Sequence, residues 1–557
     1  MKNKNEQKTP LKWTLNSIKK QFPLVIALIV VQSLLACTGT ASAVCSKYVI
    51  DSATAGNSEK LIMFALLLGF VYISTLVLGS LTTYITEKCN ALIQLNMKSQ
   101  FFSKITRKNY EDISGFHTGT LINRLTSDIS VIAGCVTNAL PKVFSTIVKL
   151  ICAFVAIVSF EPWFAIVFGF GGAAIFFVTR FMRKTLKKLH KKVQEEDDKV
   201  RSFWQESLSN LLAVKVFSNE GNMTEKSLKL QNGLFNAKLK KAKFHAFTTA
   251  SYSSAIYLSY LFAFFWCASR LFVKSVGFTY GTFTAIMQLV GQVQQPFTTM
   301  SGIIPQYYNA MASAERIMEI EDMDDEVVAD EGFDVDKIYN SLKCIKIDNL
   351  GFAYKRDNDK VFDNLNFEIE KGDFAAIVGP SGIGKSTLFK IILGVYSPKE
   401  GSITLECEDQ TYQCTGLTRK LFTFVPQGNM IFSGTIRENI TFVNDNATPE
   451  QIDRVLKLSC ADEFVNTLPD GIETVIGEKG LGLSEGQVQR LAIARALLST
   501  APIILLDEAT SALDGVTEAK VLQNLRSLTD KTCLIVTHRK KALSVCNKKL
   551  EIKINND

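Results

Sequence analysis

Six long apolar runs alternate with polar segments in the first part of the chain. They lie near residues 22–45, 60–84, 140–160, 162–180, 246–269 and 279–304. Each has about the 20 residues that an α-helix needs to cross a lipid bilayer. The pattern therefore predicts six membrane-spanning helices.

The segments between these runs alternate in length. Those after the first, third and fifth runs are short, whereas residues 85–139 and 181–245 form long segments rich in Lys and Arg. In the long segments apolar residues recur every three to four positions, which indicates helices. Because basic segments stay on the inner side, we expect a multi-pass protein of the plasma (inner) membrane with its N-terminus in the cytoplasm. Its helices should continue past the membrane into the cytosol.

The second part of the chain follows a different pattern. An acidic stretch at 319–334 ends the membrane part, and from about residue 343 short β-rich runs alternate with helical ones. Such alternation is typical of an α/β domain with a largely parallel sheet. We expect a cytoplasmic segment over 1–21, an all-α six-helix membrane domain over 22–311, an acidic linker over 312–342 and an α/β domain over 343–557, also cytoplasmic.

Composition agrees with a membrane protein. Hydrophobic residues make up 47% of the 557, which is high for a soluble chain. The net charge of +8 would suit a nucleic-acid partner, but its Lys and Arg residues flank the apolar runs, so we expect no nucleic acid. The 12 cysteines include no CxxC pair, which favours reduced thiols over disulfides or a metal site.

The strongest chemical signal is "FAAIVGPSGIGKST" at 374–387, an apolar strand that runs into GxxxxGKS and then a helix. Its glycines, Gly379, Gly382 and Gly384, allow the backbone N–H groups to wrap phosphates. Lys385 reaches the β- and γ-phosphates and the Ser386 hydroxyl binds Mg²⁺. This context predicts a P-loop that binds a nucleoside triphosphate.

Two further apolar strands end in polar residues. "PIILLDEAT" at 502–510 ends in Asp507, suited to hold Mg²⁺ through water, and Glu508, placed to orient or deprotonate the attacking water. "CLIVTHR" at 533–539 delivers His538, and a contact with the γ-phosphate is favoured over a structural role. Ligands gather at such strand ends in α/β sheets.

Two other candidates are ambiguous on their own. Gln427 follows a strand and a proline in "FTFVPQGNMIF" at 422–432, and a role at the site is as plausible as a structural one. Tyr354 could stack on a nucleotide base through its ring face, although a lone tyrosine is more often part of the core.

Together these stretches resemble the ATP-binding-cassette (ABC) family. Tyr354, the 379–387 loop, Gln427, "LSEGQ" (483–487), "ILLDE" (504–508), "SALD" (511–514) and His538 occur in the order and spacing of its nucleotide-binding domain. The six spans resemble the type I exporter membrane domain. "TGTLINRLTSDI" (118–129) and "ESLSNLLAVKVFSNE" (206–220) are similar to its two intracellular loops, and "ETVIGEKG" (473–480) to its exporter-specific loop.

The resemblance implies the roles of individual residues. ATP would be bound by Tyr354, Gly379, Ser381, Gly382, Gly384, Lys385, Ser386 and Thr387. The catalytic residues would be Glu508, His538, Gln427 and Lys385. The residues that bind Mg²⁺ would be Ser386, Gln427 and Asp507. The signature residues Leu483, Ser484, Gly486 and Gln487 would cap ATP held by a second domain, and Ser511 and Asp514 would line the dimer interface.

With one domain of each kind, the chain looks like half of a transporter. A homodimer is favoured because every catalytic element is present, and the alternative partner is a homologous half-transporter.

Glu485 departs from the family pattern, which usually has glycine there. Ser484 and Gln487 form an S-x-x-Q capping box, and the helix dipole favours an acid in the first turn. A carboxylate about 4 Å from the γ-phosphate would cost about 4 kcal/mol at an effective dielectric near 20. We therefore expect Glu485 to point away from ATP.

The resemblance implies ATP-driven export, or translocation between leaflets, by alternating access. A membrane regulator or channel gated by ATP is the alternative. None of the six apolar runs contains Asp or Glu, so an amphipathic lipid, drug or peptide suits better than a cation. Polar side chains in the spans could contact this cargo or bond to other helices. The candidates are Gln288, Gln292, Gln295, Tyr257 and Lys149.

Overall fold

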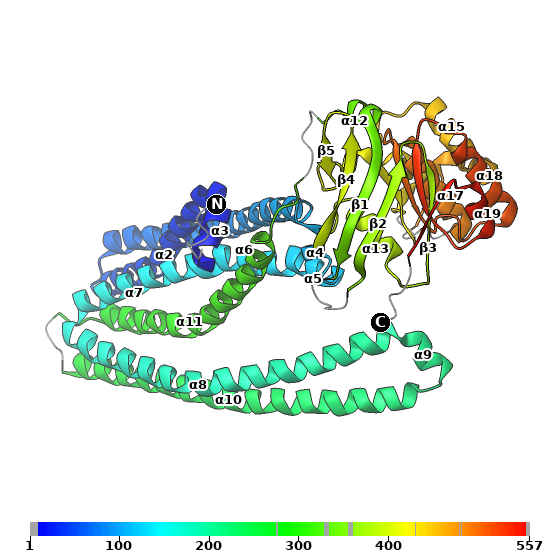
Figure 1. The fold of residues 1–557 in the computed structure, drawn as a ribbon. Helices are drawn as coiled ribbons and strands as arrows, with labels where there is room; N and C mark the ends of the chain where they lie inside the picture. The colour runs from blue at the N-terminus through cyan, green and yellow to red at the C-terminus, as the bar shows by residue number, and fades with distance from the viewer. Residues whose placement is uncertain are drawn as a thin grey trace. The chain divides into compact units, whose positions relative to one another are not determined.

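The computed structural model describes residues 9–273, 277–327, 333–354, 360–428, 431–477, 480 and 482–552, without the side chains of 164–184, 187, 252, 256 and 294–301. Contacts divide the chain into two compact units, and Figure 1 traces both. The first comprises Met1–Ser103 and Thr118–Glu321, and the second comprises Lys104–His117 and Asp322–Asp557. We describe each unit by itself.

The first unit is built from long helices. Every one of the six apolar runs lies inside a helix: in order, α2 (Phe22–Thr54), α3 (Ser58–Ile105), α7 (Leu140–Phe160), α8 (Pro162–Ser209), α10 (Glu220–Phe272) and α11 (Tyr280–Glu321). The shorter elements are α1 (Pro10–Ser17), η1 (Lys19–Gln21), α5 (Thr118–Asn123), η2 (Arg124–Asp128), α6 (Ile129–Gly134), η3 (Cys135–Ala139) and α9 (Leu211–Val216).

Within the described residues, four stretches are long and apolar enough to cross a membrane: Lys19–Thr54, Ser58–Ile105, Thr118–Phe160 and Glu220–Phe272. They contain the first, second, third and fifth of the expected spans. The fourth and sixth spans, in α8 and α11, include side chains outside the described set and stay predictions.

The surface of α3 is that of a helix in lipid. Leu66, Phe70 and Leu76 are 71%, 66% and 72% exposed. A contiguous apolar surface of this kind is rare on a soluble monomer. Small residues such as Ala43, Ala153 and Ala263 are fully buried where the helices pack together, as close helix approach in a membrane requires.

A buried polar network closes one end of the helical unit. Asp128, 2% exposed, accepts hydrogen bonds from Ser313 Oγ at 2.8 Å and Arg316 Nε at 3.0 Å. Arg124 donates to the carbonyl of Arg316 at 2.6 Å and to Glu319 at 2.9 Å. These bonds hold the last turns of α11 in the helical unit, which corrects the expected linker: residues 312–321 are helix and not linker.

The second unit has two main sheets. An antiparallel sheet has the order β2-β1-β4-β5, a parallel sheet the order β11-β3-β10-β9-β6, and β7 pairs with β8. The strands are β1 (Leu342–Phe352), β2 (Phe362–Glu370), β3 (Phe374–Val378), β4 (Glu400–Cys407), β5 (Thr411–Gln413), β6 (Phe422–Val425), β7 (Gly434–Thr435), β8 (Val475–Ile476), β9 (Ile503–Asp507), β10 (Thr532–Val536) and β11 (Lys548–Glu551).

Helices surround these sheets. They are α12 (Val335–Ser341), α13 (Lys385–Ile392), α14 (Ile436–Thr441), α15 (Pro449–Leu458), α16 (Asp462–Val465), α17 (Glu485–Leu498), α18 (Gly515–Arg526) and α19 (Lys540–Val545), with short turns η4 (Arg419–Leu421) and η5 (Gly471–Glu473). Every residue of β3, β9 and β10 is buried, as expected of parallel strands with both faces covered. The prediction of a helical membrane domain followed by an α/β domain is confirmed.

A short segment from the membrane half belongs to the second unit. It carries α4 (Tyr110–Ile113) and lies between the second and third apolar runs. The backbone N–H of Asn109 donates to Asp324 O at 3.1 Å, and Lys108 pairs with Asp325 at 2.7 Å. The ring of Tyr110 packs edge-on against Tyr396. The linear order of the sequence does not show that this segment belongs to the second unit, because only its contacts assign it there.

Candidate functional site

The P-loop joins β3 to α13. Gly384 is the N-cap of α13 with φ 103°, and a Cβ there would lie 2.3 Å from Val361 Cγ1, so only glycine fits. Lys385 is 6% exposed, and its Nζ donates to the carbonyls of Gly379 and Pro380 at 2.9 and 2.8 Å. The loop thus holds an ammonium group beside the free N–H groups of a helix N-terminus, an arrangement that binds phosphate.

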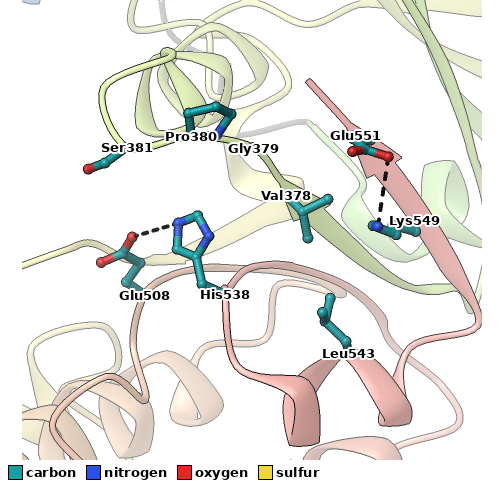
Figure 2. A pocket seen from close by; sticks show the side chains of 9 residues that line it. All are labelled: Val378, Gly379, Pro380, Ser381, Glu508, His538, Leu543, Lys549 and Glu551. Carbon is teal, nitrogen blue, oxygen red and sulfur yellow. Dashed lines mark ion pairs between the residues drawn. The ribbon is translucent and has the colours of Figure 1, made fainter. Parts of the chain in front are cut away.

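Glu508 lies at the centre of the polar groups expected at the site. Gln427 Nε2 donates to Glu508 Oε2 at 2.7 Å, and His538 Nε2 lies 3.7 Å from Glu508 Oε1. The reason is sheet register: Val536 pairs with Asp507 across the parallel strands β10 and β9, so Glu508 and His538 leave the same edge. Figure 2 shows the two side chains pointing toward each other beside Ser381 of the P-loop.

The conformation of Glu508 is strained. Its φ of 49° lies in the left-handed region, which costs a residue other than glycine about 1–3 kcal/mol. Such strain persists only where the surrounding structure fixes it. The position of Glu508 is therefore fixed by tertiary contacts rather than by local preference.

Asp507 has the environment of a metal ligand. It is 2% exposed, it is bonded to Ser386, and its Oδ1 has no hydrogen-bond partner. Burial raises the pKa of this carboxyl, with the charge of Glu508 acting in the same direction. An orphaned buried carboxylate oxygen beside a serine hydroxyl fits Mg²⁺, which takes oxygen ligands.

A hollow of about 650 Å³ opens between the P-loop and the strand ends (Figure 2). It is lined by Val378, Gly379, Pro380, Ser381, Glu508, His538, Leu543, Lys549 and Glu551. The last-named pair, Lys549 and Glu551, lies 3.8 Å apart on β11. Leu543, Lys549 and Glu551 are not anticipated from the sequence, because no motif marks them. Lys549 and Glu551 reach the hollow through the pairing of β11 with β3, and Leu543 comes from α19.

Tyr354 lies against α13. Its hydroxyl is 2.6 Å from Thr387 Oγ1, and its ring packs edge-on against Phe352 and Tyr396. The structure thus places Tyr354 next to the P-loop helix, and stacking on a nucleotide base stays a prediction.

The signature stretch opens α17 as expected. The Ser484 hydroxyl accepts from Gln487 N at 3.3 Å, and the Gln487 side chain accepts from Ser484 N at 2.8 Å, so the capping box is confirmed. Gly486 lies close to the loop between β9 and α18, since a Cβ at Gly486 would lie 2.9 Å from Ala512 O. Glu485 is exposed and Leu483 packs against the core. Their action on a second molecule stays a prediction.

The interface-loop candidates take part in local bonds. Ser511 Oγ accepts from Gln489 Nε2 at 3.0 Å. Asp514 caps α18, where it accepts from Val516 N at 2.9 Å and Thr517 N at 3.1 Å. Its hydrogen bonds with the Thr517 side chain and with backbone N–H groups lower the pKa of Asp514 to about 2.

Sequence reasoning missed the support behind His538. The next residue, Arg539, donates to Glu518 Oε2 at 3.0 Å, to Leu513 O at 2.9 Å and to Ser511 O. Glu518 is 2% exposed and also accepts from Thr510 at 2.9 Å. The residue that indicates this support is Glu518, which is buried on the inner face of α18. Its burial is known only once the helix is packed against the rest of the unit.

The membrane candidates differ in their surroundings. Gln292 Nε2 of α11 donates to Gly39 O of α2 at 2.7 Å, which is a bond between helices. Gln288 and Tyr257 are exposed and Lys149 is half-buried. The side chain of Gln295 lies outside the described residues. A role for these residues in binding cargo stays a prediction.

Comparison with known proteins places the chain in a family. The model for the ABC transporter transmembrane region matches residues 25–297, and the model for the ABC transporter matches residues 362–511. The ATP-dependent lipid A-core flippase of Desulfotalea psychrophila is 30% identical over 529 residues, which cover 94% of this chain and 90% of that protein.

Two further proteins support the same conclusion. ABC transporter B family member 1 of Dictyostelium discoideum is 31% identical over 473 residues, 84% of this chain and 51% of that protein. The solved structure of a bacterial Atm1-family ABC exporter with ATP bound shares the fold, with a TM-score of 0.79, 23% identity and coverage of 96% of this chain and 93% of that chain. The resemblance found in the sequence is confirmed: the chain belongs to the ABC transporter family, as an integral membrane protein whose helical domain is followed by an ATP-binding α/β domain.

Proposed function

We propose that this chain uses ATP hydrolysis at Glu508 to export an amphipathic substrate, or to move it from the inner to the outer leaflet, as a homodimer in the plasma (inner) membrane. The observation that carries the proposal is the position of Glu508, bonded to Gln427 and facing His538 next to the P-loop. A lipid substrate is supported by the flippase among the relatives.

The residues act on ATP in distinct ways. Lys385 and the N–H groups at the start of α13 neutralise the phosphates, while Glu508 orients the attacking water and accepts its proton. Gln427 holds the Glu508 carboxylate by a hydrogen bond, and His538 lies beside it. Ser386, Gln427 and Asp507 would hold Mg²⁺, which would supply positive charge to neutralise the phosphates.

The signature argues for a dimer. The capping box at the start of α17 leaves N–H groups of its first turn available to an anion. The chain has one P-loop and one signature, so two copies would close two equivalent sites. Binding of ATP at both sites would favour the closed pair, and hydrolysis would release it.

An ATP-gated regulator or channel is the competing function. Such a protein needs nucleotide binding but could do without hydrolysis. The grouping of Gln427 and His538 around Glu508 supports pumping instead, because these residues serve hydrolysis and not nucleotide binding alone.

The decisive experiment is ATP hydrolysis by the purified full chain in lipid nanodiscs. Glu508→Gln should abolish turnover, whereas Glu370→Gln, an exposed glutamate on β2, should leave it unchanged. Lipids, amphipathic drugs and short peptides are then added in turn, and the class that stimulates turnover identifies the cargo. Turnover that persists in Glu508→Gln, or none from the unaltered chain under any condition, would overturn the proposal.

A further inference from the structure

One side of the first unit carries a dense group of basic residues that ATP-driven transport does not explain. Seven Lys and Arg residues lie within 180–192 and four within 238–243, whereas residues 162–194 and 226–272 contain no Asp or Glu. Positive charge near a span sets topology. Topology alone does not require that two such groups face each other.

The two groups do face each other across α8 and α10. These helices run antiparallel and side by side (Figure 1). Trp204 Nε1 donates to Ser227 Oγ at 2.9 Å, and Lys241 Nζ lies 3.1 Å from His190 Nδ1. This register sets residues 238–243 opposite residues 188–193. Positive charges from both helices are therefore brought together.

Among the side chains that the structure describes, only part of this charge is paired with carboxylates. Lys192 pairs with Glu196 at 3.1 Å and Lys191 with Glu195 at 4.0 Å. In contrast, four exposed lysines pair with no carboxylate among the side chains that the structure describes: Lys188, Lys238, Lys240 and Lys243. We call these four, with His190 and Lys241, the basic collar. Like charges three residues apart on one helix repel, as Lys240 and Lys243 do on α10, so a bound anion would stabilise this part of the helix pair.

The position of the collar indicates where that anion comes from. Lys243 is three residues from the apolar run at 246–269, and Lys188 is eight residues from the run at 162–180. At 1.5 Å per residue this is at most about 12 Å, within reach of lipid headgroups for long lysine side chains. Phe247, 64% exposed, adds an apolar surface at the same level.

We propose that the basic collar binds the phosphates of anionic phospholipids in the cytoplasmic leaflet, with Phe247 against their acyl chains. The chemical group that the collar would bind is a phosphate monoanion or diester, and soluble phosphate compounds carry the same group. The apolar surface beside the collar and its closeness to the spans favour the lipid as the source. The site is separate from the nucleotide site and does not depend on the transport proposal.

The test is lipid binding by the full chain in detergent, followed by native mass spectrometry with phosphatidylglycerol and with phosphatidylcholine as probes. Replacing Lys238, Lys240, Lys241 and Lys243 by Gln should weaken phosphatidylglycerol binding at least tenfold and leave phosphatidylcholine binding unchanged. The same four positions changed to Arg should retain binding. The control is Lys226→Gln with Lys229→Gln, farther along the same helix, which should change binding less than twofold.

Three outcomes would overturn the proposal. The first is unchanged phosphatidylglycerol binding by the fourfold Gln variant. The second is an equal loss in the Arg variant or in the control, which would indicate a disturbed helix pair or a general charge effect. The third is displacement of the lipid by millimolar glycerol phosphate, because the collar would then bind soluble phosphate compounds rather than lipid.

Discussion

Individual carboxylates of the nucleotide site differ sharply in their surroundings. Asp507 is buried with one oxygen unpartnered, Glu508 is held by Gln427 in a strained conformation, and Glu485 is exposed at the start of α17. Under the proposed function, these differences in burial and bonding suit Asp507 to a metal ion, Glu508 to the attacking water and Glu485 to the helix dipole. Two predictions belong to this scale.

Replacing Glu485 by Gly should change ATPase turnover by less than about threefold, because an exposed side chain at the first turn has room to point away from the phosphates. The measurement is steady-state ATPase in nanodiscs for both proteins. A tenfold gain in the glycine variant would mean that the glutamate repels the γ-phosphate and slows the enzyme.

Replacing Asp507 by Asn should raise the melting temperature of the nucleotide-free protein. Because burial raises the pKa of Asp507, its ionised form destabilises the fold at pH 7, and this penalty fades as the pH falls toward the ordinary value of 3.8. A gain of about 1 kcal/mol corresponds to about 2–4 °C for a domain of this size. Scanning calorimetry from pH 7 down toward pH 4 should show the gain shrinking. A lower melting temperature for the Asn variant at pH 7 would contradict the prediction.

At the scale of elements, the site depends on which strands are neighbours. β9 and β10 are parallel and in register, so their ends release Glu508 and His538 side by side. The helix α18 then braces the residue after His538, through the ion pair of Glu518 and Arg539 at 3.0 Å. A change in α18 should therefore reach the catalytic group without touching ATP.

Glu518→Gln should lower kcat about tenfold while leaving KM for ATP within twofold, because it loosens the loop that carries His538 but not the P-loop. Loss of the charge beside Arg539 should also cost about 1–3 kcal/mol of stability. Lys520→Gln, an exposed change on the same helix, is the control. A change in KM alone would show that Glu518 supports binding instead of positioning.

At the scale of the whole molecule, each unit has hydrogen bonds or ion pairs close to the residues where the chain continues into the other unit. In the helical unit Arg124 and Asp128 are bonded to the last turns of α11. In the α/β unit Lys108 and Asn109 are bonded to residues 324 and 325. Within each unit, these bonds join two segments that continue into the other unit.

The proposed dimer predicts complementation between two inactive chains. Lys385→Ala disables the P-loop and Ser484→Arg disables the signature, so each homodimer should lack turnover. Co-assembly of the two variants would join one intact P-loop to one intact signature and should restore about a tenth to a half of wild-type turnover per dimer. Assembly is followed by two affinity tags on the purified mixed dimer. A mixed dimer without turnover would show that the signature serves its own chain.

Much of this protein is determined locally in its sequence. The apolar runs specify long helices because about 20 apolar residues in succession have no stable exposure to water, and all six runs lie in helices. The P-loop, the ends of β9 and β10 and the capping box of α17 are likewise local, since each depends on residues within one strand or turn.

Tertiary structure alone decided the rest. The bracing of His538 by Glu518, the lining of the hollow by Lys549 and the facing charges of α8 and α10 join residues far apart in the chain. The boundary of α11 at Glu321 follows from its buried contact with Asp128, although the sequence there turns acidic. Pairings of this kind depend on strand or helix register and on packing. The pattern along one segment predicts neither, because the free energy of such a contact depends on both of the segments that form it.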